Sequence, residues 1–135
     1  MDELTLQICT TDGVAFDGAV KDVTLRSVVG DVCIMKNHAN YMTAIDYAKV
    51  KINTADGRTL VAACTEGFLS VSDSKARLIA TTFEFSDAID IQRAEKAATN
   101  ARERIEQKRS PDDLARAEAK LKRALIRLSV AGSNH

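Results

Sequence analysis

Residues 83–101 read FEFSDAIDIQRAEKAATNA, and the pattern of the whole sequence changes within this stretch. Before it, short runs alternate apolar and polar residues and are separated by turn-forming pairs. After it, glycine and proline are absent from residue 87 to residue 109, and alanine recurs at helical spacing. Because the apolar period changes from two residues to about 3.6, we expect a strand-rich domain over residues 1–86 and a helical domain over residues 87–135.

The first domain is predicted to contain many short strands. Leu4, Leu6 and Ile8 alternate with polar neighbours, as in a half-buried strand. Asp56-Gly57 lies between two alternating runs and is the strongest hairpin signal. The other candidates are residues 14–16, 20–25, 32–35, 42–45, 48–53, 59–64, 68–72 and 75–82. Because no helix intervenes, this pattern predicts an antiparallel β-sandwich or barrel, and the whole chain is of the α+β class.

The second domain is predicted to be an antiparallel two-helix hairpin. Ser86 or Asp87 can cap the first helix, and Ser110 caps a second helix that runs from Pro111 to about Val130, before Gly132. The first helix carries an apolar stripe made of Ala94, Ala97, Ala98, Ala101 and Ile105. The second carries a heptad pattern made of Leu114, Ala117, Leu121, Ala124 and Leu128, with Leu125 beside it.

A helix interface built from alanine and leucine buries little apolar area, because a methyl group contributes far less than a larger aliphatic side chain. The same composition has high helix propensity. These two properties describe helices that persist while their packing is weak. We therefore interpret the hairpin as a detachable element.

The formal net charge is zero, with 19 Lys and Arg residues against 19 Asp and Glu residues. Residues 1–86 carry eight basic and eleven acidic residues, whereas residues 87–135 carry eleven and eight. Zero net charge, an aromatic content of 4% and the absence of Trp argue against a nucleic-acid partner. Part of the basic excess forms a ridge on the second helix: Arg116, Lys120, Arg123 and Arg127. Its spacing fits either a solvated face or an anion site.

The sequence predicts no catalytic site and no metal site. It contains no nucleophile, phosphate-loop or metalloprotease motif, and His38 and His135 are its two histidines. The three cysteines are widely spaced in apolar runs, so we expect buried free thiols in a cytosolic protein. No stretch is apolar over the length that a membrane helix needs, and the acidic start is unlike a signal peptide.

Three segments resemble a known family. Residues 66–71 (EGFLSV) resemble its glycine-phenylalanine strand, and residues 30–39 (GDVCIMKNHA) resemble a glycine-led strand with its following loop. Residues 89–94 (IDIQRA) match its motif I/L-D-x-x-R-A. With these segments the whole chain resembles the epsilon subunit of bacterial F-type ATP synthase. One departure is KNHANY at residues 36–41, where the family usually has PGHAPL in a loop near the rotor ring.

The resemblance implies a non-catalytic subunit of the central stalk of a proton- or sodium-translocating ATP synthase, at the cytoplasmic face of the cell membrane. In this family a ten-stranded sandwich binds the gamma (shaft) subunit and the c-ring of the membrane rotor. The helical hairpin either folds against the sandwich or extends into the alpha/beta catalytic head, and extension is associated with blocked ATP hydrolysis. A stand-alone protein-interaction adaptor is the alternative function.

The resemblance also implies a regulatory ATP site, although no cofactor is required. The residues that match the family's ATP-binding positions are Glu84, Ile89, Asp90, Arg93, Ala94, Arg123 and Arg127. Asn100 stands where some ATP-binding members have another arginine, and Arg102 is a candidate to replace its charge. Two other uses remain open: Asp90 suits the start of a helix in any protein, and the arginines of the second helix can meet acidic residues of the catalytic head.

Overall fold

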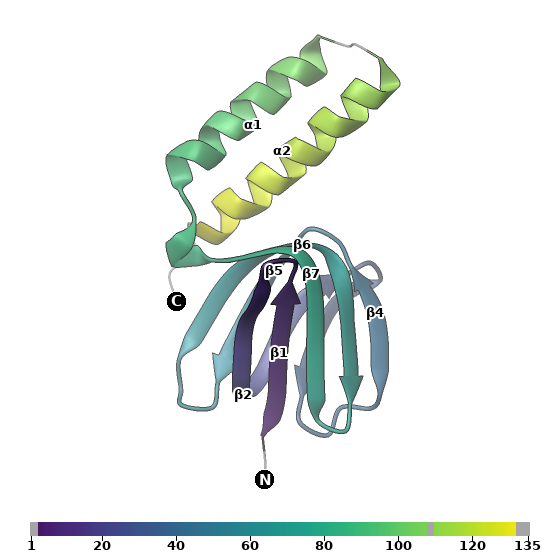
Figure 1. The fold of residues 1–135 in the computed structure, drawn as a ribbon, viewed down its shortest axis with the longest axis vertical. Helices are drawn as coiled ribbons and strands as arrows, with labels where there is room; N and C mark the ends of the chain where they lie inside the picture. Colours follow the sequence, from purple (N-terminus) through teal and green to yellow (C-terminus); the bar gives the residue numbers. More distant parts are fainter. Residues whose placement is uncertain (1–2, 108–109, 132–135) are drawn as a thin grey trace.

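The computed structural model describes residues 3–107 and 110–131, which form a β-sandwich and a helical hairpin standing on one end of it (Figure 1). The strands are β1 (Leu4–Thr10), β2 (Gly13–Ser27), β3 (Gly30–Met35), β4 (Tyr41–Ile45), β5 (Ala48–Thr54), β6 (Thr59–Ser72) and β7 (Lys75–Phe85). A 3₁₀ turn, η1 (Ser86–Ala88), leads to α1 (Ile91–Glu106) and α2 (Pro111–Ala131). The predicted combination of a sandwich and a two-helix hairpin is confirmed.

The strands form one hydrogen-bonded sheet folded over on itself. Its order is β1-β7-β6-β4-β2-β3, with β5 paired to β2 and β6 and a further pairing between β1 and β2. Every pair is antiparallel except β1 with β7, which is parallel. The expected antiparallel sandwich therefore contains one parallel pair, formed where the first strand lies between β2 and the last strand.

The described residues form seven continuous strands, not about ten, because two expected breaks do not occur. β2 continues through Asp17-Gly18, and β6 continues through Glu66-Gly67. The first half of β6 pairs with β5 and its second half pairs with β4, so a single strand serves two neighbours in succession. β2 also changes partners along its length: its first half pairs with β1, and its second half pairs with β3 and β5.

Gly67 allows two strands to approach closely and does not form a turn. A Cβ atom placed on it would lie 2.0 Å from the carbonyl oxygen of Ile79 on β7. By contrast, Gly57 in the predicted β5–β6 hairpin has a φ of 93°, a left-handed conformation that glycine adopts without strain. The side chain of Thr54 closes that hairpin by accepting a hydrogen bond from the Arg58 amide at 2.9 Å.

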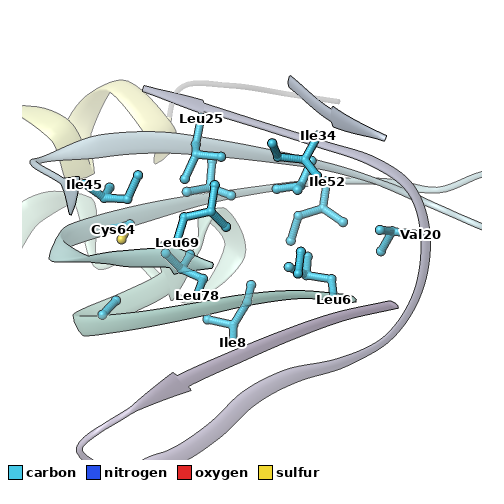
Figure 2. Packing of buried hydrophobic residues seen from close by; sticks show 14 of the residues in the cluster. Leu6, Ile8, Val20, Leu25, Ile34, Ile45, Ile52, Cys64, Leu69 and Leu78 are labelled. Carbon is cyan, nitrogen blue, oxygen red and sulfur yellow. The ribbon is translucent and has the colours of Figure 1, made fainter. Parts of the chain in front are cut away.

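The core lies between the two layers of the sandwich (Figure 2). Leu4, Leu6 and Ile8 are fully buried, as their alternation predicts. The inward positions of β2 change phase between Val20 and Val23, where the pairing of β2 with β5 shifts register. The larger side chains that converge here include Leu25, Ile34, Ile45, Ile52, Leu69 and Leu78.

The prediction that all three thiols are buried is wrong for one of them. Cys64 is buried, Cys9 is half-buried, and Cys33 is exposed because it occupies an outward position on β3, next to the inward Ile34. Burial raises the pKa of the Cys64 thiol from its ordinary 9.0 to about 12. This thiol therefore stays protonated at neutral pH.

The Cys64 thiol should make folding stability fall at alkaline pH. Between pH 9 and pH 12 the unfolded chain loses this proton while the folded chain keeps it. The free energy of unfolding should therefore decrease by up to about 1.4 kcal/mol per pH unit from this group. Urea unfolding at several pH values across this range should show that the free energy of unfolding falls less steeply with pH for Cys64→Ala than for the wild type. Cys33→Ala should show the same dependence on pH as the wild type. Equal slopes for all three proteins would contradict the assignment.

The helix boundaries agree with the sequence except at the first cap. Asp90 caps α1, because its Oδ1 accepts a hydrogen bond from the Arg93 amide at 3.0 Å; the predicted caps, Ser86 and Asp87, lie in η1 instead. Ser110 caps α2 as predicted, accepting from the Asp113 amide at 3.3 Å. The predicted stop at Gly132 lies outside the described residues.

The two helices pack on each other through the predicted alanines. Ala94, Ala98 and Ala101 of α1 and Ala117 and Ala124 of α2 are buried. The leucines of α2 are less covered than the heptad suggests, since Leu114, Leu121 and Leu128 are half-buried and Leu125 is exposed. Neither described helix is both long and apolar enough to cross a membrane. The contact between α1 and α2 is therefore continuous but thin.

The hairpin contacts the sandwich through the C-terminal end of α2 (Figure 1). Val130 is fully buried and packs with Ile89 against Val61 and Ala63 on β6. The stretch from Val61 to Thr65 is buried at every position, because the core covers one face of β6 and the hairpin covers the other. This small cluster, separate from the main core, is the apolar part of the docking contact.

Candidate functional site

A groove of about 310 Å³ runs between the two helices. It is lined by Arg93, Ala97, Asn100, Ala101 and Arg104 from α1 and by Lys120, Arg123, Ala124 and Arg127 from α2. Five of these nine side chains are cationic and none is a carboxylate. Such a concentration of guanidinium and ammonium groups favours an anionic ligand.

Helical spacing places the cations along the groove and the alanines beneath them. On α1, Arg93, Ala97, Ala101 and Arg104 recur every three or four residues, so they share one face. On α2 the same spacing aligns Lys120, the adjacent pair Arg123-Ala124, and Arg127. Because Ala101 and Ala124 are buried between the helices, the groove exists only while α1 and α2 lie side by side.

One ion pair joins the groove to the sandwich. Nε of Arg127 lies 2.7 Å from Oε1 of Glu84 on β7, and Nη2 donates a hydrogen bond to Oε2 at 3.1 Å. The side chains are 20% and 33% exposed, respectively, so this pair is better shielded from solvent than the other ion pairs between described residues. Arg127 thus faces both the groove and the sandwich.

The Glu84–Arg127 pair should contribute measurably to hairpin docking. A double-mutant cycle with Glu84→Gln and Arg127→Gln should give a coupling energy of about 1 kcal/mol in urea unfolding, because the hydrogen-bonded pair is partly shielded from water. The matched control is Arg26 with Asp31, whose side chains are 69% and 72% exposed at 3.0 Å. Equal coupling energies for the two pairs would mean that shielding from solvent does not strengthen the Glu84–Arg127 pair.

A second polar contact joins α2 to the sandwich, at Tyr47. Oη of Tyr47 donates a hydrogen bond to Oε1 of Glu66 at 3.2 Å, and Nζ of Lys122 lies 6.0 Å from the centre of the tyrosine ring. Burial, followed by the hydrogen bond to Glu66, raises the pKa of Tyr47 against the opposing charge of Arg123. α2 is therefore held to the sandwich by polar contacts at Arg127 and Lys122 in addition to the Val130 cluster.

Of the seven predicted site residues, three line the groove, one contacts it through an ion pair, and three occupy structural positions beside it. Arg93, Arg123 and Arg127 line the groove, and Glu84 reaches it through Arg127. The other three have structural positions: Ile89 is buried under the hairpin, Asp90 caps α1, and Ala94 is buried between the helices.

Asn100, which stands where some ATP-binding members of the family have an arginine, lines the groove, but Arg102, the candidate to replace that charge, does not. The additional cation comes from Arg104, which follows Asn100 by one helical turn and so shares its face. Counting four residues onward from Asn100 would have found it. Lys120 belongs to the predicted basic ridge, whereas Arg116 lies outside this groove.

Sequence reasoning also missed where the hairpin docks. The signal was the continuous run Leu60-Val61-Ala62-Ala63-Cys64, which does not alternate with polar residues. A strand that is covered on both faces typically has a continuous apolar sequence of this kind. The missing alternation in β6 therefore marked a second contact surface on the outside of the sandwich.

Neither a metal centre nor a histidine-based catalytic group is found among the described residues. No group of three His, Cys, Asp or Glu side chains there could hold a metal ion. His38 lies in the loop between β3 and β4, with Nδ1 2.8 Å from the carbonyl oxygen of Ala39. His135 lies outside the described residues. Asn37, where the family usually has glycine, has a φ of 64°, a conformation that Asn tolerates better than most residues.

Comparison with known families covers both parts of the chain. The model described as "ATP synthase, Delta/Epsilon chain, beta-sandwich domain" matches residues 3–86, and the one described as its long alpha-helix domain matches residues 87–132. The chain belongs to the ATP synthase delta/epsilon family. Relatives within it include the epsilon chains of several bacteria. That of Caldicellulosiruptor bescii is 37% identical over 134 residues, covering 99% of this chain and 97% of the relative.

A second epsilon chain, from an Exiguobacterium strain, is 34% identical over 131 residues and is covered to 96%, as is this chain. Among solved structures, a chain of the Euglena gracilis mitochondrial ATP synthase superposes with a TM-score of 0.85 at 17% identity, covering 97% of this chain and 82% of that one. A chain from the central stalk and c-ring of the Tetrahymena thermophila enzyme gives 0.59 at 11% identity, covering 94% and 95%. At these identities the structural matches establish the fold.

Membership of the delta/epsilon family assigns the chain a place in ATP synthase. It is an epsilon chain, a non-catalytic stalk subunit of that membrane-bound complex. The alternative of a stand-alone adaptor is therefore not supported. The predicted absence of catalytic residues fits this assignment, and the groove becomes a candidate for regulation of the complex.

Proposed function

We propose that this chain couples the catalytic head to the membrane rotor and regulates ATP hydrolysis through its helical hairpin. The sandwich binds the gamma shaft subunit and the c-ring at the cytoplasmic face of the membrane, and the extended hairpin reaches the alpha/beta head. The observation that carries this proposal is the thin attachment of the hairpin, which consists of the Val130 cluster and a few polar contacts, among them Arg127 with Glu84 and Lys122 with the Tyr47 ring. A small free-energy gap between two arrangements is what a switch needs.

ATP is the proposed regulatory ligand of the folded form. The groove needs both helices side by side, so a ligand bound there stabilises the folded hairpin by RT ln(1 + [L]/Kd). Its five cations crowd like charges between α1 and α2, and a triphosphate relieves that repulsion. Cellular ATP would thereby keep the hairpin away from the catalytic head.

The β3–β4 loop is the proposed contact with the c-ring. Asn37 supports this, because it maintains the left-handed backbone that glycine would otherwise provide. The loop can therefore keep the family's shape despite its different residues. The coupling ion, proton or sodium, is a property of the c-ring.

Deletion of residues 87–135 tests the inhibitory role. In the reconstituted ATP synthase, the truncated chain should raise ATP hydrolysis above that of the full-length chain, because the extended hairpin can no longer reach the head. Co-purification with the gamma subunit should be unaffected, since the sandwich is intact. Unchanged hydrolysis with intact assembly would contradict inhibition by this hairpin.

Arg123→Ala should weaken ATP binding to the isolated chain by about tenfold, equivalent to about 1.4 kcal/mol, because it removes one guanidinium from the groove. The matched control is Arg102→Ala, an exposed arginine of α1 outside the groove. Calorimetry measures both affinities. If the two substitutions had the same effect, the groove would not be the ATP site.

A further inference from the structure

We propose that Tyr47, which belongs to the sandwich, is a positioning residue for the ligand groove of the hairpin. Its hydroxyl group holds the side chain of Arg123 from outside the groove, so an anionic ligand binds more tightly while the hairpin is docked on the sandwich than after it has left. This proposal rests on the proposed regulatory site and specifies how a ligand in that site acts on docking.

Among the described residues, the lining of the groove belongs entirely to the hairpin. The lining side chains come from α1 and α2, so a hairpin that left the sandwich with its helices still paired would take the groove with it. A ligand shifts an equilibrium only as far as its affinities for the two states differ. Occupancy of the groove therefore acts on docking only if a residue of the sandwich contacts a side chain of the lining.

Tyr47 is in contact with such a side chain. Its Oη donates a hydrogen bond to Oε1 of Glu66 on β6 at 3.2 Å, which leaves the lone pairs of the hydroxyl oxygen to accept a hydrogen bond from α2. Burial and then Glu66 raise the pKa of Tyr47, and the charge of Arg123, together with its hydrogen bond to the hydroxyl, opposes that rise. Because Arg123 also lines the groove, one guanidinium takes part in both contacts.

Tyr47 has a fixed position where α2 meets the sandwich. It lies in the two-residue connection between β4 and β5, whose adjoining ends, Ile45 and Ala48, are buried. Nζ of Lys122 lies 6.0 Å from the centre of the Tyr47 ring. One helical turn further along α2, Ile126 lines a cavity of about 420 Å³ together with Tyr47. The sandwich therefore presents the hydroxyl at a defined place on the path of α2.

A fixed hydroxyl reduces the loss of entropy when a ligand binds Arg123. An arginine side chain has many rotamers, and a ligand that must immobilise a free one binds more weakly for that reason. While the hairpin is docked, Tyr47 already orders the guanidinium, which keeps most of its N–H donors for the oxygens of an anion. Ordering one such side chain in advance corresponds to about threefold to tenfold in affinity. By reciprocity, a bound anion strengthens docking by the same factor.

Tyr47→Phe in the full chain tests the proposal, because it removes the hydroxyl and keeps the ring that Lys122 contacts. Calorimetry with ATP as the probe should give an affinity at least about threefold below that of the wild type. The matched control is Tyr41→Phe, a tyrosine of β4 whose ring packs on His38 and which lies outside the groove lining. Its affinity for ATP should equal that of the wild type.

The outcomes separate this proposal from the proposed regulation by ATP. Wild-type affinity in Tyr47→Phe, or equal weakening by Tyr47→Phe and Tyr41→Phe, would overturn the role of Tyr47 and leave the regulation intact. Absence of ATP binding to the wild type would overturn both.

A double-mutant cycle with Arg123→Ala separates positioning of Arg123 from any other effect of the tyrosine. If the hydroxyl acts through this guanidinium, Tyr47→Phe should have no further effect on ATP affinity in the Arg123→Ala protein. A threefold loss that persisted there would show that Tyr47 acts by another route, against the proposal.

Discussion

Gly67→Ala should destabilise the sandwich by about 3 kcal/mol or more, because the new methyl group has no space. Its Cβ would lie 2.0 Å from the carbonyl oxygen of Ile79 and 2.9 Å from the Cα of Ala80. Both are backbone atoms of the paired strand β7, so relief requires β6 and β7 to separate. Urea unfolding of the full chain should show a lower midpoint with an unchanged slope.

Gly18→Ala is the matched control for this substitution. Gly18 also lies within a long strand, but the nearest atom to its added Cβ is in the Phe16 ring at 3.7 Å, an ordinary contact. Neither glycine has a left-handed φ, so the two substitutions differ mainly in the space available. If Gly67→Ala were as mild as Gly18→Ala, the close approach of β6 and β7 would not exist as described.

Ala98→Leu should separate the hairpin helices while the sandwich stays folded. Ala98 is 2% exposed and lies on the face of α1 that packs on α2. Three extra carbon atoms there should cost the closed hairpin about 2 kcal/mol by overpacking. The open population should then rise by about 30-fold, and trypsin should cleave within residues 91–131 correspondingly faster.

Ala115→Leu tests whether overpacking is the cause. Ala115 is exposed on α2, so a leucine there makes the same chemical change without entering the helix interface. Its cleavage rate should match the wild type. Equal acceleration by Ala98→Leu and Ala115→Leu would point to an effect other than packing. If neither substitution accelerated cleavage by trypsin, the interface between α1 and α2 would have room for a leucine side chain at residue 98.

Features set by local sequence were predictable. The alternation of Leu4, Leu6 and Ile8, the hairpin at Asp56-Gly57 and the Ser110 cap depend on neighbouring residues, and all three are confirmed. The alanine stripe of α1 is confirmed for the same reason, because helical spacing alone decides which residues share a face.

Features set by distant residues were not predictable from local patterns. Whether Gly67 ends a strand or lets one pass close to its neighbour depends on β7, which follows it in the sequence. The exposure of Leu125 depends on how little of α2 the sandwich covers. The parallel pairing of β1 with β7 joins strands from opposite ends of the sandwich domain, and no short segment encodes it.

The candidate site was predicted in part. The spacing of cations on α2 indicated a charged ridge, and the family motif added Arg93, but neither could show that these groups meet across the hairpin. Asp90 illustrates the opposite case. It matches the family's ATP-binding motif, yet its side chain caps α1, so the motif also serves to begin the helix. Sequence matching could not separate these two roles.

Amide hydrogen exchange of the full chain with and without ATP tests most directly whether the hairpin is a detachable element that its ligand holds closed. The helices α1 and α2 should exchange faster than the core strands β5 and β6, and saturating ATP should slow exchange in both helices while the strands change little. The reference is β5, whose inward residues Val50 and Ile52 are fully buried. Helices as protected as β5 without ATP, or helices unaffected by ATP at a concentration that saturates calorimetric binding, would contradict a detachable hairpin held closed by its ligand.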